Sequence, residues 1–242
     1  MEFMKDWLYY SLVSLIRKNW LERKYPNRVV KYEFQDSDEL PDLDKPAIYV
    51  ANHWIGENRS LTPCVIACSL PVRFYPWIAS DLTNYKDAHA LLKRGFIDSD
   101  INLDNEITKF FLSLGIAMVT VPMIRTIGVI PVYSGDTSKI RRSFEISLEY
   151  LREGKSLLIF PEDSHTEMRD GVYPFQSGVG HLVNQYQDTG DPITVYPIAV
   201  DGSANVIVGY PVIFQDRKPR REISLELEKK VRDLYNSNED SE

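Results

Sequence analysis

The fold is decided most clearly by residues 137–160, which read TSKIRRSFEISLEYLREGKSLLIF. Apolar side chains recur every three or four residues from Ile140 to Leu151, a spacing that predicts a helix over 137–152 with one apolar face. Gly154 supplies a stop signal for this helix, and the apolar run at 156–160 predicts a buried strand. A helix followed so soon by a buried strand is typical of an α/β fold.

Elements of the same kind are predicted on both sides of this stretch. The pattern indicates strands at 47–51, 128–132 and 193–200, short helices at 63–70 and 104–114, and an exposed loop at 33–44. Asp104 is the expected cap of the helix at 104–114 and Gly115 its expected end. Because strands alternate with helices, we expect a single α/β domain with a mainly parallel mixed sheet flanked by helices. Its predicted bounds are 32–235, between an N-terminal segment 1–31 and an acidic tail 236–242.

The N-terminal segment 1–31 is basic, although the chain of 242 residues carries a net charge of -7. It holds seven basic and three acidic residues, a net charge of +4, which leaves -11 for the remainder. Within it, Trp7, Leu12, Leu15 and Ile16 fall at helical spacing among lysines and arginines, so residues 2–24 predict an amphipathic helix. Such a helix can lie in a membrane interface or pack on its own domain, and periodicity does not distinguish the two.

Composition excludes several other classes of function. The acidic balance argues against general nucleic-acid binding. The sequence shows no signal peptide and no apolar run long enough to span a bilayer, so we expect a peripheral location on the cytoplasmic side of a membrane. Cys64 and Cys68, the only cysteines, are spaced for one helix face and predict buried thiols. The four histidines match no metal motif and no phosphate-binding glycine loop is present, so neither a metal nor a cofactor is expected.

Polar clusters follow two of the predicted strands. His53 comes directly after 47–51, and a run of five polar residues comes after 156–160: Glu162, Asp163, Ser164, His165 and Thr166. The carboxyl ends of strands in an α/β sheet meet at one edge, so a histidine and a carboxylate are expected at one rim. His53 is suited to general base catalysis, and Glu57 or Asn58 could fold back to orient its ring. Glu162 or Ser164 could instead simply cap a helix.

These clusters belong to a set of blocks that resembles the PlsC-like lysophospholipid (glycerolipid) acyltransferase family over residues 45–205. Asn52-His53, followed after four intervening residues by Asn58, resembles the family's Asn-His-x4-Asp block. The further blocks follow in the family's order: Gly128-Val129-Ile130-Pro131-Val132, Phe160-Pro161-Glu162, Pro174-Phe175-Gln176-x-Gly178 and Val195-Tyr196-Pro197-Ile198.

The resemblance implies an enzyme that moves a fatty acyl group from acyl-CoA or acyl carrier protein to a lipid hydroxyl. His53 would be the general base, with Asn58 and Glu57 beside it, and Glu162 would hold the polar head of the acceptor. The other expected substrate-binding residues are Asp163, Ser164, His165 and Ser134. The apolar stretch 110–124 would help to form an acyl groove, and the N-terminal helix would meet the membrane.

The chain departs from the family pattern at three positions. Asn58 stands where the family has the aspartate that orients the histidine, and an amide cannot neutralise an imidazolium. Ser134 and His165 replace two arginines associated with the phosphate of the acceptor, so we expect an acceptor other than lysophosphatidic acid. Two alternatives stay open: a catalytically inactive relative that binds lipids or membranes, and an acyl-thioester hydrolase. A covalent serine route is disfavoured because the sequence has no Gly-x-Ser-x-Gly motif.

Overall fold

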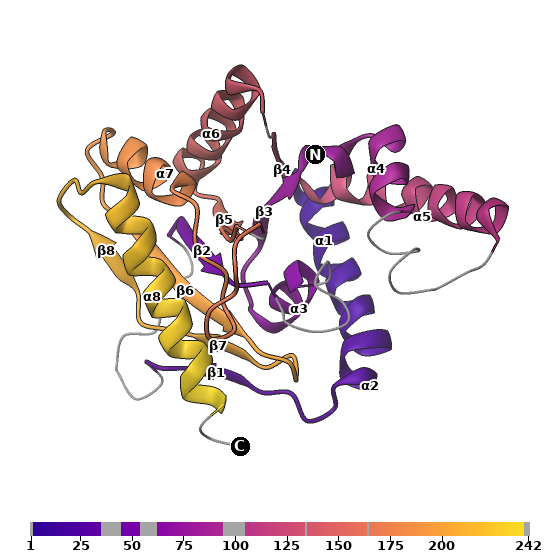
Figure 1. Ribbon diagram of the computed structural model, residues 1–242, viewed down its shortest axis with the longest axis horizontal. Helices are drawn as coiled ribbons and strands as arrows, with labels where there is room; N and C mark the ends of the chain where they lie inside the picture. Colours follow the sequence, from indigo (N-terminus) through magenta and orange to yellow (C-terminus); the bar gives the residue numbers. More distant parts are fainter. Residues whose placement is uncertain are drawn as a thin grey trace. The chain divides into compact units, whose positions relative to one another are not determined.

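The structure, a computed structural model, describes residues 2–34, 45–53, 62–93, 105–133, 135–163 and 165–239. By its internal contacts the chain divides into two compact units. The first comprises Met1–Tyr9 and Tyr75–Ser143, and the second comprises Tyr10–Phe74 and Phe144–Glu242. Strands and helices alternate along the chain (Figure 1), so the predicted α/β class, with a mainly parallel mixed sheet flanked by helices, is confirmed.

The sheet of the second unit is built around β2 (Ala47–Ala51), which lies between two parallel neighbours, β5 (Ser156–Ile159) and β6 (Ile193–Val200). The other edge of β6 carries two antiparallel strands, β7 (Val206–Val208) and β8 (Val212–Phe214), and β1 (Val30–Tyr32) pairs in parallel with β7. The three strands predicted at 47–51, 156–160 and 193–200 are therefore confirmed. Val50 is paired with both Ile159 and Pro197, so β2, β5 and β6 end at the same edge.

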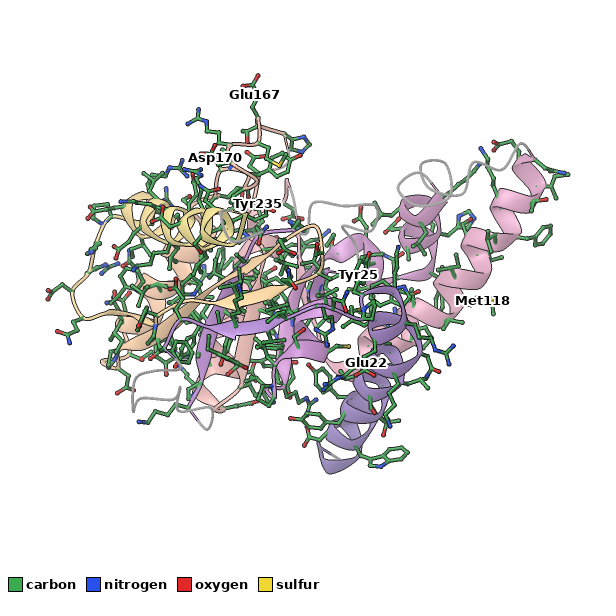
Figure 2. All side chains as sticks on the ribbon, turned by 90° about the horizontal axis from the view of Figure 1, so that it is seen from below. Glu22, Tyr25, Met118, Glu167, Asp170 and Tyr235 are labelled. Carbon is green, nitrogen blue, oxygen red and sulfur yellow. The ribbon has the colours of Figure 1, made fainter. Side chains whose placement is uncertain are left out.

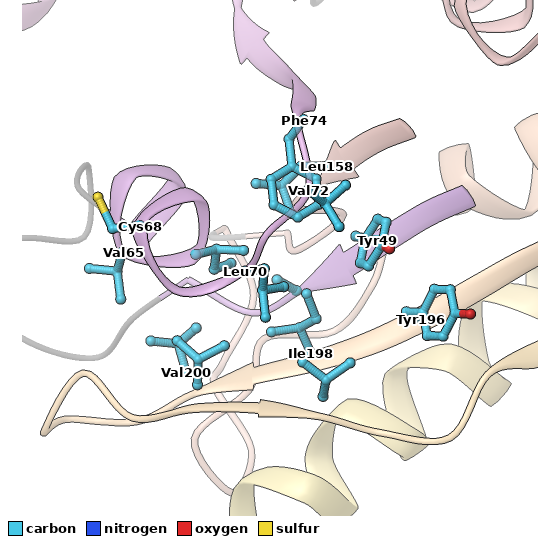
Figure 3. Close-up of a cluster of buried hydrophobic side chains, with 14 of the residues drawn as sticks. Tyr49, Val65, Cys68, Leu70, Val72, Phe74, Leu158, Tyr196, Ile198 and Val200 are labelled. Atoms are coloured by element: carbon cyan, nitrogen blue, oxygen red, sulfur yellow. The ribbon is translucent and has the colours of Figure 1, made fainter. Parts of the chain in front are cut away.

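Helices cover both faces of this sheet because its strand side chains are apolar on both sides. The stacked rings of Tyr49 and Tyr196, whose centroids lie 5.1 Å apart, belong to one buried cluster with side chains of α3 (Thr62–Ser69) (Figure 3). Two helices pack against the opposite face and contact each other: α7 (Gly178–Gln187) and α8 (Arg220–Glu239). The predicted helix at 137–152 is α6 (Thr137–Arg152).

The first unit contains a short parallel strand pair and a helical hairpin. Strand β3 (Phe74–Ala79) pairs with β4 (Ile130–Val132), and a 3-10 turn, η3 (Ser80–Thr83), precedes α4 (Tyr85–Leu92). The prediction of a helix at 104–114 was wrong at both ends. Asn105 caps α5 (Glu106–Ile127), which continues through Gly115. A glycine inside a helix costs only about 1 kcal/mol, and burial of Ala117, Val121 and Ile124 beyond it favours continuation.

The predicted N-terminal helix is present as α1 (Glu2–Ile16), a π-helical turn η1 (Arg17–Leu21) and α2 (Glu22–Lys24). Val13, Ile16, Trp20 and Leu21 pack into the core of the second unit. Trp7 and Leu15, expected on the same apolar face, are instead 62% and 60% exposed. The helix therefore packs on its own chain with one face and keeps large apolar side chains on another. None of the helices within the described ranges combines the length and apolarity needed to cross a bilayer.

Candidate active site

Asn52, directly after β2, ties the ends of two strands together. Its side-chain amide donates to the Val200 carbonyl oxygen at 3.0 Å, and its amide oxygen accepts the Val200 N–H at 2.8 Å. The side chain is completely buried, so these bonds replace those that water would otherwise supply. Asn52 thereby fixes the backbone at the point where the chain continues into His53.

His53 and Glu162 meet at the edge of the sheet where β2 and β5 end. The His53 backbone N–H donates to Glu162 Oε2 at 2.6 Å, and His53 Nδ1 lies 2.8 Å from the same oxygen. The Glu162 side chain is 1% exposed, whereas that of His53 is 36% exposed. A carboxylate only accepts hydrogen bonds, so this contact places the ring hydrogen on Nδ1. The lone pair of Nε2 is then available to take a proton, which is the arrangement that a general base needs.

Neighbouring groups hold both members of this pair. The His53 ring packs on Phe160, with ring centroids 4.9 Å apart. Glu162 Oε1 accepts the Tyr173 N–H at 2.8 Å, so the carboxylate receives three N–H groups in total. A buried carboxylate is stable only when such donors surround it. Glu162 is therefore held as a fixed acceptor facing His53.

The segment after Glu162 folds back as a hairpin. Asp163 N–H donates to the Pro174 carbonyl at 2.8 Å, and the tip closes between Arg169 and Val172. Asp170 and Gly171 at the tip both have positive φ, +46° and +74°, which an Asp-Gly turn of type I′ requires. Glu167 and Asp170 project outward from this hairpin, and the ring of Tyr235 lies against Gly171 (Figure 2).

Of the remaining predicted site residues, only Asp163 and His165 lie within the described part of the chain. Asp163 Oδ1 accepts the His165 N–H at 3.1 Å, which stabilises the exposed turn at the start of the hairpin. Neither side chain contacts His53 among the described residues. Asn58, Glu57, Ser134 and Ser164 lie outside the described residues. Their predicted roles stay predictions.

His181, the other histidine near the hairpin, belongs to the packing of the second unit. It lies on α7, and its ring meets that of Phe144 edge to face, with centroids 4.8 Å apart. Burial, together with the charges of Arg220 and Arg217, lowers the pKa of His181 below its ordinary value. Its imidazole is therefore neutral at pH 7.

The apolar stretch 110–124, predicted to contribute to an acyl groove, forms most of α5 in the first unit. Phe111, Met118 and Val119 on this helix are each more than 60% exposed, and Met118 is marked in Figure 2. The acyl groove stays a prediction. Across the described ranges, no group of three or more histidine, cysteine or acidic side chains is arranged to hold a metal ion.

Sequence reasoning missed two functional contacts at this site. The first is the cross-link that Asn52 makes to Val200, for which a polar residue immediately after a fully apolar strand was the available signal. The second is the Tyr173 N–H that binds Glu162. A backbone donor leaves no trace in a side-chain pattern, so only the fold of the hairpin identifies it.

Comparisons with known proteins indicate an acyltransferase domain in this chain. Residues 112–201 match the family model described as Acyltransferase. The matched range contains Glu162 and the blocks around 128–132, 174–178 and 195–198, and begins after His53. No curated protein sequence matches the chain. Among solved structures, the chain is similar to the 1-acyl-sn-glycerophosphate (LPA) acyltransferase PlsC from Thermotoga maritima. The identity is 15% and the TM-score 0.52, over 93% of this chain and 80% of that one. Residues 112–201 therefore match the acyltransferase family model, and the chain shares its fold with the PlsC structure.

Proposed function

We propose that this acyltransferase moves a fatty acyl group from acyl-CoA or acyl carrier protein to the hydroxyl of a lysolipid-type acceptor, with His53 as general base. The observation that carries the proposal is the contact of 2.8 Å between His53 Nδ1 and Glu162 Oε2, with Glu162 buried and the His53 ring partly exposed. The contact at Nδ1 leaves the lone pair on Nε2, and the His53 side chain as a whole is partly exposed.

The reaction that this pair supports has two proton transfers. His53 Nε2 removes the proton of the acceptor hydroxyl while the oxygen attacks the thioester carbonyl. The new C–O bond forms, the C–S bond breaks, and the imidazolium returns its proton to the departing thiolate. Glu162, next to Nδ1, stabilises the imidazolium between these steps. In this proposal Glu162, from another loop, supplies the carboxylate that Asn58 lacks.

This assignment changes the role proposed for Glu162. The family resemblance implies that it holds the acceptor, but both of its oxygens already accept N–H groups from His53 and Tyr173. A carboxylate that is so buried and so fully bonded is better suited to orient His53 than to bind a lipid head group. Selection of the acceptor then falls to other residues. Since Ser134 and His165 replace arginines, we propose an acceptor without a terminal phosphate monoester, in contrast to lysophosphatidic acid.

The N-terminal helix supports a peripheral association with the cytoplasmic face of a membrane. Besides Trp7 and Leu15, its exposed residues include Tyr10, Arg17 and Lys18. Large apolar and aromatic side chains next to basic ones are the composition of helices that lie in a membrane interface. Loss of binding to anionic vesicles in the variant Trp7→Ser/Leu15→Ser, with the fold intact, is the expected result. Undiminished binding would contradict this part of the proposal.

The decisive experiment is turnover of a labelled acyl-CoA, and of acyl carrier protein, against a panel of lysolipids in the wild type and His53→Ala. We expect labelled product that depends on the acceptor and is lost in the variant. Because the base on a partly exposed His53 ring could also deprotonate water, thioester cleavage is measured with and without acceptor. Thioester cleavage at the same rate with and without acceptor would identify a hydrolase. Absence of turnover with retained lipid binding would identify an inactive relative, and strong selective use of lysophosphatidic acid would refute the acceptor proposal.

A further inference from the structure

Phe175, on the returning arm of the hairpin, lies directly opposite Glu162. The two residues form an antiparallel bridge, flanked by the bond from Asp163 N–H to the Pro174 carbonyl and by the bond of 2.7 Å from Gln176 N–H to the Pro161 carbonyl. In a pair flanked in this way, the N–H and C=O of the two residues point away from the partner strand. Phe175 is 1% exposed, so its backbone groups need partners from elsewhere in the protein.

Helix α8 supplies both partners. Glu228 Oε2 accepts the Phe175 N–H at 2.9 Å, and the guanidinium of Arg221 donates to the Phe175 carbonyl oxygen. Arg221 and Glu228 are seven residues apart, two helical turns, and therefore share one face of the helix. Two side chains of α8 thus hold the backbone N–H and C=O of a single buried residue, Phe175.

Glu228 is itself a buried carboxylate with a defined counter-charge. The residue is 6% exposed, and Oε1 lies 2.6 Å from Nη2 of Arg232, one turn further along α8. A carboxylate buried in this way is destabilising unless it is paired and hydrogen-bonded. Here Arg232 supplies the pairing and the Phe175 N–H the hydrogen bond. Glu228 is consequently fixed, and it fixes Phe175.

The same arm of the hairpin carries the donor that holds the catalytic carboxylate. Tyr173, two residues before Phe175, donates its N–H to Glu162 Oε1 at 2.8 Å, while Glu162 Oε2 contacts Nδ1 of His53. We propose that Glu228 is a positioning residue for the reaction, acting through Phe175 and Tyr173 on the Glu162–His53 pair. Arg221 assists it from the carbonyl side. The expected effect of Glu228 on turnover rests on the proposed function, whereas its expected effect on the tautomer of the His53 ring does not.

Substitution of Glu228 separates positioning from simple folding. In Glu228→Ala the Phe175 N–H loses its acceptor, and we expect kcat to fall about 10- to 100-fold, the range for a small misplacement of a catalytic group. Glu228→Gln keeps an oxygen for the Phe175 N–H, while the partly exposed Arg232 can turn to water, and we expect this variant to recover kcat to within about 3-fold, by the same reasoning. The matched control is Glu226→Ala. Glu226 lies on the same helix but pairs with Lys218, and we expect wild-type kcat.

A second readout reports on the His53 ring without requiring turnover. Ring ¹⁵N chemical shifts, assigned with His53→Ala, show which nitrogen carries the hydrogen. We expect Nδ1–H in the wild type and in Glu226→Ala, and a detectable share of the other tautomer in Glu228→Ala. If Glu228→Ala does not fold, Arg221→Ala is measured in its place, and we expect kcat and the ring shifts to change in the same direction. Unchanged kcat and unchanged ring shifts in a folded variant would overturn the proposal. A wild type without turnover would refute the proposed function alone, since the ring shifts would still test the positioning.

Discussion

Replacement of Glu162 by glutamine tests the central contact of the site with the smallest change in shape. The carboxylate accepts three N–H groups, from the His53 backbone and ring at Oε2 and from Tyr173 at Oε1. Glutamine has one oxygen and one NH₂ group, so it cannot accept at both ends. With its oxygen toward His53, the NH₂ opposes the Tyr173 N–H. In the opposite orientation, the NH₂ faces His53 and favours the tautomer that leaves no base at Nε2.

Both orientations lower activity and stability, because the NH₂ faces the Tyr173 N–H in the first and the His53 backbone N–H in the second. A buried donor left facing another donor costs about 1–3 kcal/mol of unfolding free energy. Loss of the charge that stabilises the imidazolium, or of the correct tautomer, reduces kcat by about 10²–10⁴. At about 1.36 kcal/mol per factor of ten, this range corresponds to about 3–5.5 kcal/mol of transition-state stabilisation. We therefore expect a folded protein in Glu162→Gln with a large loss of kcat.

Steady-state kinetics with a labelled acyl thioester and varied acceptor distinguish the two roles considered for Glu162. If Glu162 orients His53, kcat falls for every acceptor and the KM of the acceptor changes little. If Glu162 binds the acceptor, its KM rises while kcat is largely kept, and that result would refute the reasoning. Glu167→Gln is the matched control, because this glutamate lies on the same hairpin, is exposed and projects outward (Figure 2). We expect wild-type kinetics for it.

Three further predictions concern the framework of the site. In Gly171→Ala, a Cβ would lie 2.2 Å from the Tyr235 ring at a φ of +74°, so we expect a loss of about 2–5 kcal/mol in urea unfolding. In Asn52→Ala, both hydrogen bonds to the Val200 backbone are lost, and we expect about 2–4 kcal/mol of destabilisation together with reduced turnover. Burial raises the pKa of Cys64 and of Cys68 to about 11. Both thiols should therefore resist a thiol reagent at pH 8, where a fraction on the order of 10⁻³ is thiolate, and react faster as the pH rises toward 11.

Each of these predictions has a control. Gly190→Ala shares a positive φ, +96°, but has open space around the added Cβ, so only about 1–2 kcal/mol is expected. Equal losses in the two glycine variants would exclude the Tyr235 contact as a cause. Asn52→Ala with wild-type stability would show that the bonds to Val200 are dispensable. Prompt reaction of both cysteines in the native protein, as fast as in concentrated guanidinium, would contradict their burial.

The sequence by itself was sufficient for the central strands β2, β5 and β6, for α6 and for the order of the motifs. The helix at 137–152 and the strands at 47–51 and 193–200 were predicted with the bounds that the structure shows. Side-chain periodicity is a local property that survives in the linear sequence, and the Gly154 stop signal is also local. The convergence of His53 and Glu162 could be expected as well, because parallel strands end at one edge of their sheet.

Helix α8 is an element that the sequence prediction missed. Ile223, Leu227 and Val231 recur every four residues and are fully buried, a pattern that the sequence contains but that was not used. The end of α5 could not be read in the same way. Gly115 is a stop signal in isolation, and the contacts of Ala117 and Val121 with α4 decide that the helix continues.

Only the tertiary structure decided which acidic side chain serves His53 and which groups hold it. In the sequence, Glu162 and Asp163 are adjacent carboxylates directly after a predicted strand, and both were expected to bind the acceptor. Folding buries one of them, Glu162, among three N–H donors and leaves Asp163 on an exposed turn. The choice depends on hydrogen-bond geometry and desolvation across residues about a hundred positions apart, and neither quantity is encoded in a pattern of neighbouring residues.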